Sequence, residues 1–278
     1  MNRPRCAIVV VLVAVSCAAT RGACAAESLP RPNPWTHHAP SADQDRFRFA
    51  VVADRTGGHR PGVFIDAVRK LNLLQPNFVM SVGDLVEGDT DDAAEIDQMW
   101  DEFDGIVGRL EMPFYFVSGN HGISNEVMAS KWTERFGRTY YHFIYRDILF
   151  LCLNTEEEQA TGISRDQVEY FANTLREHPA AHWTLVFMHK PLWMDQTDRG
   201  WLEIEKLLQN RPYTVFAGHL HQYLKSTRFG RRYFVLATTG AVSTLDGPAH
   251  GLFDHIMWVT MTDEGPQIAN LMLDGIWD

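Results

Sequence analysis

The chain has 278 residues, of which 45% are hydrophobic, and its formal net charge is −10 at pH 7. An acidic balance of this size argues against non-specific nucleic-acid binding, and no nucleic-acid partner is expected. Beyond the N-terminal region the sequence has no run of about 18 uninterrupted apolar residues, so no transmembrane segment is expected in the mature chain.

The N-terminal residues have the pattern of an export signal. Arg3 and Arg5 provide a positively charged start, and residues 7–15 form a short apolar core. Residues 23–25 resemble a small-residue cleavage site. We therefore predict a signal peptide at residues 1–26 and an exported protein, either periplasmic or secreted.

Three of the four cysteines lie inside the predicted signal, and one of them offers a second route to the membrane surface. Lipoprotein anchoring at Cys17 is an alternative that Ala14 disfavours, because such sites usually carry a branched apolar residue there. After cleavage only Cys152 remains, so no internal disulfide is expected. Its place in the strand-like run at residues 148–153 indicates a small buried side chain.

Residues 27–45 are rich in proline and polar residues, and they are expected to form an extended linker. Residues 46–278 are long enough for one large α/β domain. Short apolar runs there alternate with helical patterns. Runs of four to eight apolar residues predict buried strands, and they lie at residues 49–53, 78–83, 114–119, 183–188 and 213–218.

Apolar residues at helical spacing predict helices between these strands, at residues 61–74, 91–110, 125–136 and 201–208. Another helix is expected to begin at Ser164, with Gln167 placed for a capping box. A hairpin is predicted from two strands, at residues 140–145 and 148–153. The C-terminal strands predict a sheet that is partly antiparallel, and they lie at residues 233–238, 255–261 and 267–273.

Each of the first five strands ends in residues that can bind a metal. These are Asp54, Asp84, Asn120 with His121, His189, and His219 with His221. Ligands of α/β sheets gather outside the carboxyl ends of the strands. One edge therefore collects the carboxylates, amide and imidazoles of a metal-dependent hydrolase. An extended backbone at residues 219–221 is expected to turn both imidazoles to the same side.

The chain carries in order Asp54, the run G-D-x-x-x-G at residues 83–88, G-N-H at residues 119–121, the lone His189 and G-H-x-H at residues 218–221. Over residues 46–260 the chain resembles the calcineurin-like metallophosphoesterase superfamily in this order. The resemblance implies a four-layer α/β/β/α sandwich with mixed β-sheets and a dinuclear metal centre. The implied cofactors are two divalent or mixed-valence ions, with Mn, Fe or Zn expected.

The resemblance also implies a role for each motif residue. Asp84 would bridge the two ions, Asp54 and His221 would hold the first, and Asn120, His189 and His219 would hold the second. A bridging hydroxide would attack a phosphate ester, with His121 as the catalytic residue that protonates the leaving oxygen or stabilises the phosphoryl charge. The expected partner is a small phosphorylated substrate, either a monoester or a diester. The sequence predicts no oligomeric state.

The chain departs from the superfamily pattern at several positions. Thr56 replaces the histidine of the first motif, and His59 is one candidate for the missing ligand. Arg55 is a candidate phosphate contact. Gly122 stands where an acidic residue usually supports the G-N-H histidine, and Glu87 stands where purple acid phosphatases need a tyrosine. A weakly or non-catalytic relative that binds metal and a phosphate ligand is therefore an alternative, and a structural metal protein of the cell envelope is a third hypothesis.

The other histidines are interpreted as core or surface residues, and they are His142, His178, His182, His250 and His255. Aromatic and polar residues also cluster after His189. Among them, Trp193 and Met194 are candidates for a substrate pocket, whereas Trp201 fits the packed face of a helix equally well.

Overall fold

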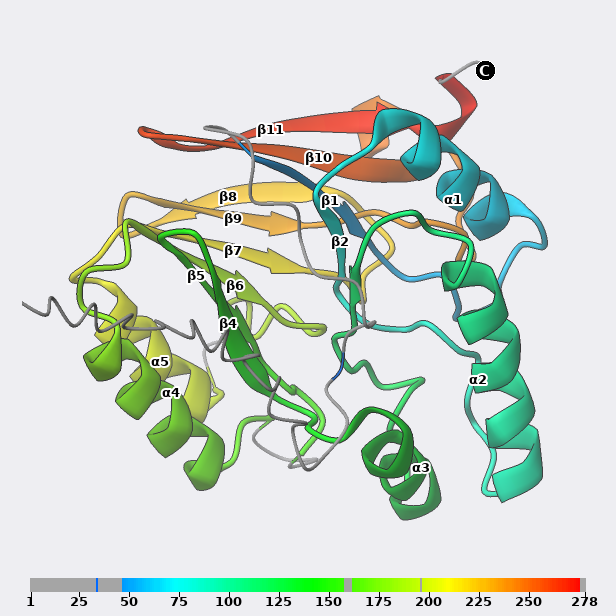
Figure 1. Cartoon of the computed structure of the whole chain (residues 1–278), viewed down its shortest axis with the longest axis horizontal. Coiled ribbons are helices and arrows are strands. Elements are labelled where there is room, and N and C mark those ends of the chain that lie inside the picture. The colour runs from blue at the N-terminus through cyan, green and yellow to red at the C-terminus, as the bar shows by residue number, and fades with distance from the viewer. Residues whose placement is uncertain (1–33, 35–46, 158–161, 196, 276–278) are drawn as a thin grey trace, which may run out of the picture. The chain divides into compact units, whose positions relative to one another are not determined.

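The computed structural model describes residues 34, 47–157, 162–195 and 197–275 (Figure 1). The predicted signal peptide lies outside the described residues, so export stays a prediction. Of the predicted linker only Pro34 is described. It is buried, and its carbonyl oxygen accepts a hydrogen bond from the backbone N–H of Phe116 at 2.7 Å. This point of the linker is thus bound to the domain.

The first sheet contains three parallel strands and an antiparallel pair. Its order is β11-β10-β1-β2-β3. β1, β2 and β3 run parallel, whereas β10 pairs antiparallel with both β1 and β11. The bounds are β1 (Arg48–Val52), β2 (Phe78–Ser81), β3 (Phe114–Tyr115), β10 (His255–Thr262) and β11 (Gly265–Met272).

The second sheet is also mixed, with the order β4-β5-β6-β7-β9-β8. The four inner strands are parallel, and the edge strands β4 and β8 are antiparallel to their neighbours. The bounds are β4 (Tyr141–Tyr145), β5 (Ile148–Cys152), β6 (Trp183–Phe187), β7 (Tyr213–Ala217), β8 (Leu224–Arg228) and β9 (Arg231–Val235).

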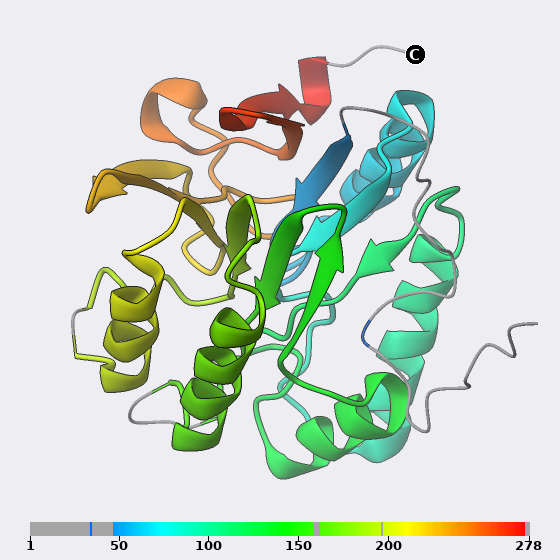
Figure 2. The same cartoon turned by 60° about the vertical axis from the view of Figure 1, so that its left-hand side comes forward.

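Helices cover the outer face of each sheet (Figures 1 and 2). The first sheet packs against α1 (Val63–Leu74), α2 (Ala93–Val107) and α3 (Glu126–Phe136). The second packs against α4 (Arg165–Glu177) and α5 (Arg199–Leu208). Two 3₁₀ turns, η1 (Pro248–His250) and η2 (Leu273–Gly275), complete the described elements.

Strand residues alternate between these two kinds of core. In β1, Ala50 and Val52 face the helices, whereas Phe49 and Val51 face the other sheet. Between the sheets Phe49 stacks on Phe78 of β2, with ring centroids 5.3 Å apart. A strand buried on both faces reads as a continuous apolar run, which explains why these strands stood out in the sequence. The predicted four-layer α/β/β/α sandwich with mixed sheets is confirmed.

Polar side chains begin the helices where the sequence predicted. Asp92 accepts the backbone N–H groups of Ala94 and Glu95 at the start of α2. Ser164 likewise accepts the N–H of Gln167 at the start of α4. The predicted capping box is nevertheless wrong in its second half. The buried Gln167 side chain bonds both backbone groups of Asn154, at 2.9 Å each, instead of reaching back to Ser164.

Two strands differ from the prediction. β8 was missed because its sequence, LKSTR, is mostly polar and partly exposed. It pairs at the sheet edge, where one row of hydrogen bonds to β9 suffices without a buried apolar face. β3 is also shorter than the apolar run at residues 114–119 predicted, although the whole run is buried. The apolar residues of this run are buried, but the hydrogen bonds of the strand do not continue beyond Tyr115.

Candidate metal centre

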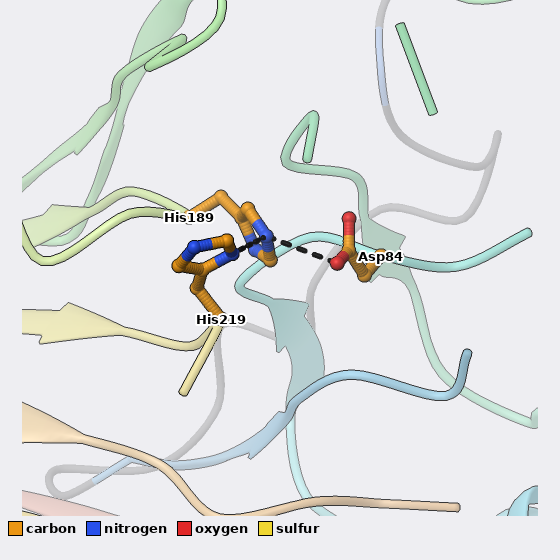
Figure 3. A group of neighbouring side chains, drawn as sticks. All are labelled: Asp84, His189 and His219. Carbon is orange, nitrogen blue, oxygen red and sulfur yellow. Dashed lines mark hydrogen bonds and ion pairs between the residues drawn. The ribbon is translucent and has the colours of Figure 1, made fainter. Parts of the chain in front are cut away.

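Both sheets deliver the motif side chains to one place. In the first sheet Asp54, Asp84 and Asn120 follow the parallel strands β1, β2 and β3, whose carboxyl ends lie at the same edge. In the second sheet His189 follows β6 and His219 follows the parallel strand β7. Figure 3 shows Asp84 from the first sheet facing His189 and His219 from the second.

Donor atoms converge on the ring of His189, which is fully buried. Its Nε2 lies 3.0 Å from Asp84 Oδ2, 2.9 Å from Asn120 Oδ1 and 3.2 Å from His219 Nδ1. Its other nitrogen, Nδ1, lies 2.9 Å from the carbonyl oxygen of Val82. A carbonyl only accepts, so Nδ1 carries a hydrogen, and in the neutral form of the ring the lone pair of Nε2 points at the other donor atoms. This arrangement suits a cation with oxygen and nitrogen ligands.

The pKa values of these residues indicate that the cluster favours a positive charge at its centre. Burial opposes the imidazolium form of His189, yet the adjacent Asp84 carboxylate raises its pKa to about 9. Burial opposes the ionised form of Asp84, yet His189 lowers its pKa to about 2. Burial, with His189 nearby, lowers the pKa of His219 to about 4. A proton on His189 therefore takes the place that a metal cation would hold.

Asp54 and His221 form a second group of donor atoms beside the first. Asp54 is fully buried, and burial raises the pKa of its carboxyl to about 8. Its Oδ1 accepts the backbone N–H of His219 at 2.8 Å and lies 3.6 Å from His221 Nε2. His221 Nδ1 lies 3.0 Å from the carbonyl oxygen of Val242, which directs Nε2 toward the carboxylate.

The other oxygen of Asp54, Oδ2, is buried and has no hydrogen-bond partner among the described residues. Leaving a carboxylate oxygen in this state is costly, and most buried polar atoms are paired. A cation at this position would satisfy the oxygen. The residues present therefore fit a second metal ion as well as the first.

The backbone at this site is held in an uncommon conformation. Asp54, Asp84, His219 and His221 have φ values of 38°, 50°, 73° and 51°. Left-handed backbone costs a non-glycine residue about 1–3 kcal/mol and gathers at functional sites. The prediction of an extended segment at residues 219–221 is therefore wrong. Turned backbone, not strand alternation, brings both imidazoles to the carboxylates.

Two glycines leave room for the carboxylates. A Cβ atom added to Gly119 would collide with Asp84, and one added to Gly218 would collide with Asp54 Oδ2. Neither glycine has a positive φ. Their role is close approach rather than turn geometry, because any side chain would displace a carboxylate.

His121 is tied to the site through its backbone and its ring. Its backbone N–H donates to Asp84 Oδ1 at 3.0 Å. Its Nδ1 lies 2.5 Å from the carbonyl oxygen of Glu87 and 3.9 Å from Asp89 Oδ2. Gly122 was expected to weaken the support of this ring. A backbone carbonyl supplies that support instead, through Nδ1 of the ring.

The polar residues of the loop after Asp54 contact other residues of the protein. Thr56 is fully buried, and its hydroxyl donates to the Glu87 carboxylate. His59 is 42% exposed and lies 3.6 Å from the same carboxylate. Arg55 is buried, and its guanidinium donates to the carbonyl of Leu85 and to Glu102. Arg55 is thus engaged within the fold instead of facing the metal centre.

Residues outside the motifs take structural positions. His255 is fully buried and accepts the N–H of Ala237 at 3.2 Å, and burial lowers its pKa to about 4. Trp193 and Trp201 belong to the core between α4, α5 and the second sheet, whereas Met194 is 53% exposed. Cys152 is buried, as predicted.

Sequence reasoning missed three contributors to the site. The carbonyl groups of Val82 and Val242 orient imidazoles, and Glu87 joins the first-motif loop to His121. No residue type marks a backbone carbonyl in a sequence. Glu87 did lie inside the G-D-x-x-x-G motif, but its side-chain role depends on the loop after Asp54.

Searches with the sequence and the structure place this fold among known proteins. No curated protein sequence matches the chain. A solved structure of PhoD has a TM-score of 0.61 at 13% identity, over 84% of this chain and 70% of that one. GAP50, titled the anchor in the inner membrane complex of Plasmodium, has a TM-score of 0.62 at 12% identity, over 82% and 85%. At these identities the likeness shows the fold alone.

A purple acid phosphatase from yellow lupin seeds, PPD1, has a TM-score of 0.60 at 14% identity. The alignment covers 85% of this chain and 53% of the lupin chain, so this chain spans about half of that protein. Among the described residues no helix is long and apolar enough to cross a membrane. The model of the calcineurin-like phosphoesterases matches residues 47–223, more than half of the sequence. The chain belongs to the calcineurin-like phosphoesterase family.

Proposed function

We propose that this protein is a metal-dependent hydrolase of small phosphate esters with a dinuclear centre. The observation that carries the proposal is the convergence of Asp84, Asn120 and His219 on Nε2 of buried His189. The partnerless oxygen of Asp54 beside that cluster supports the second ion. Family membership supports the reaction class.

Each side chain has a role that its position supports. Asp84 has two carboxylate oxygens and would be shared by both ions. Asn120, His189 and His219 would hold one ion, and Asp54 with His221 would hold the other. Bound cations of this kind supply Lewis acidity toward phosphoryl oxygens and lower the pKa of a water molecule. Mn, Fe and Zn remain the candidate metals, because imidazole and carboxylate ligands suit all three.

His121 is the proposed catalytic residue. The Glu87 carbonyl holds its Nδ1 hydrogen, which fixes the ring and leaves Nε2 as the nitrogen that faces the reaction. As an imidazolium, with a second proton on Nε2, it would give that proton to the leaving oxygen or stabilise phosphoryl charge. Its backbone N–H on Asp84 keeps the ring in register with the metal ligands.

A weakly or non-catalytic relative that binds metal and a phosphate ligand is the second candidate. It is favoured by Thr56, whose buried hydroxyl is already bonded to Glu87 where the family carries a histidine. Such a protein would bind metal and phosphate but would not need His121.

Hydrolysis of a chromogenic phosphomonoester and the matching diester, with and without Mn²⁺, tests the proposal. We expect metal-dependent turnover that Asp84→Asn abolishes and that His121→Ala lowers by about 10²–10⁴-fold. His182→Ala is the matched control, because His182 lies at the opposite end of β6 from His189 and is exposed. Turnover that survives His121→Ala while metal stays bound would show that His121 is not the catalytic residue. No turnover of either ester by the wild-type protein with metal bound would favour the second candidate.

We also propose that the protein acts outside the cytoplasm, on the strength of the signal-like pattern at residues 1–26. Mass measurement of the exported protein tests this. A mature N-terminus at Ala26 or Glu27 supports signal cleavage, whereas a lipid-modified Cys17 supports anchoring. A full-length chain retained inside the cell contradicts both.

A further inference from the structure

The two halves of the metal centre receive different numbers of donor atoms. Around His189 Nε2, three other donors lie within 3.2 Å, and Asp84, His189 and His219 form a group that could hold an ion. In the other half Asp54 and His221 lie 3.6 Å apart. Apart from Asp84, which both ions would share, no further histidine, cysteine or carboxylate among the described residues completes a comparable group around them.

Thr56 explains the shortage. It stands where the first motif carries a histidine, but its hydroxyl donates to the carboxylate of Glu87. Its backbone N–H is also engaged, by the carbonyl of Asp84 at 3.2 Å. A neutral hydroxyl already held by a carboxylate is a much poorer ligand than an imidazole nitrogen.

The neighbouring loop does not bring a substitute to the described site. A Cβ atom on Gly57 would lie 3.0 Å from the His221 ring, so bare backbone packs against that imidazole. His59 is directed to Glu87 on the exposed side of the loop. The Glu87 carboxylate itself is occupied by Thr56 and by the backbone N–H of Gly58 at 2.7 Å.

One hydrogen bond connects the two halves. The backbone N–H of His219 holds Asp54 Oδ1 at 2.8 Å, and the same residue directs Nδ1 at His189. A cation that fixes the His219 side chain in the first-filled half therefore also steadies the carboxylate of the other half. This coupling is reciprocal and strengthens both steps, so the order of filling follows from the unequal sets of ligands.

We propose that the centre fills in order: a first cation binds tightly at Asn120, His189 and His219, and a second binds weakly at Asp54 and His221. The inference rests on the proposed function in taking the centre to be dinuclear. The two dissociation constants should differ by at least about 10–100-fold, because losing even a residue that supports a ligand costs this much affinity.

Calorimetric titration of metal-free protein with Mn²⁺, in the absence of substrate, tests the order. We expect two resolved steps of one ion each. Electron paramagnetic resonance at one equivalent should show isolated Mn²⁺, and a spin-coupled pair should appear only in excess metal. Two equal tight steps, or a single step with no second ion at any concentration, would overturn the inference.

Variants separate the possible ligands. Asp54→Asn should remove the weak step and leave the tight one, whereas His189→Ala should remove the tight step. Thr56→Val keeps the shape of the buried side chain and should leave both steps unchanged. Loss of the weak step in Thr56→Val or in Glu87→Gln would show that one of these residues is a further ligand of the second ion, and the inequality argument would fail.

Placing the histidine of the family motif at position 56 should strengthen binding of the second cation. Thr56→His should strengthen the weak step by about 10-fold or more. Because Thr56 is fully buried, thermal unfolding of this variant is measured beside wild type, and the wild-type titration decides if it fails to fold. The titration measures bound metal and does not depend on turnover. Two unequal binding steps in a protein that hydrolyses no ester would therefore reject the proposed function and support this inference.

Discussion

The two halves of the metal centre differ in how the fold supplies their ligands. Around His189, each side chain follows a strand, and both sheets contribute. Around His221, the ring sits in a turn and is steadied by the Val242 carbonyl, while the loop after Asp54 offers Thr56 instead of an imidazole. The half that relies on the loop after Asp54 is therefore the half in which Thr56 leaves a ligand position without an imidazole.

The largest expected effect comes from the residue that both halves share. Asp84→Asn removes the charge that faces His189 at 3.0 Å and keeps the shape of the side chain. We expect both cations to bind poorly and turnover to be abolished, since the Lewis-acid stabilisation that both ions supply is lost. Metal content by mass spectrometry and hydrolysis rates measure this. Two bound ions in the variant would contradict a bridging role.

A smaller change should disturb one half selectively. Gly218→Ala places a methyl group against Asp54 Oδ2, so we expect loss of the second cation with the first retained. Gly105→Ala is the control, because its Cβ meets nothing within 4 Å inside α2. It should stabilise the protein by about 0.5–1 kcal/mol. Metal titration and thermal unfolding distinguish the two, and equal behaviour would show that Gly218 is no constraint.

Stability of the metal-free protein should fall as pH rises from about 6.5 to 8. Burial raises the pKa of Asp54 from 3.8 to about 8, and Asp84 outweighs burial to raise that of His189 from 6.5 to about 9. In this window the folded state holds protons that the unfolded state has released, so unfolding becomes easier with pH. A cation displaces these protons, and its stabilising effect should therefore grow.

Unfolding temperatures across this window, with and without Mn²⁺, measure the effect. Asp54→Asn should make the slope of the metal-free protein shallower, because one of the two raised groups is gone. A metal-free protein that gains stability from pH 6.5 to 8 would show that neither group holds its proton in the folded state.

The smallest effect is expected at Gly122. An added Cβ there meets its nearest neighbour at 3.5 Å, an ordinary van der Waals distance, so the first atom of the new side chain in Gly122→Asp fits. We expect turnover to change less than about fivefold, because the Glu87 carbonyl already holds His121 Nδ1 at 2.5 Å and one more hydrogen bond adds only about 1 kcal/mol. A large gain in hydrolysis would show that the carbonyl supports the ring poorly.

Sequence patterns alone determined most of the fold. Strands buried on both faces gave continuous apolar runs, and helices showed apolar spacing with caps such as Asp92 and Ser164. These signals depend on residues that are close together in the chain, so they can be recognised in the sequence. β8 was not predicted because an edge strand needs hydrogen bonds more than apolar side chains. The actual partner of Gln167 was not predicted because tertiary packing brings Asn154 to it.

The candidate ligands were also visible in the sequence, because parallel strands bring their carboxyl ends to one edge. Only the tertiary structure decided how these ligands are held. The left-handed turns at His219 and His221, the carbonyl groups behind the imidazoles and the Thr56–Glu87 pair join segments far apart in the chain. Backbone groups are the same in every residue, so their use at a site is a property of three-dimensional packing and leaves no mark in the order of side chains.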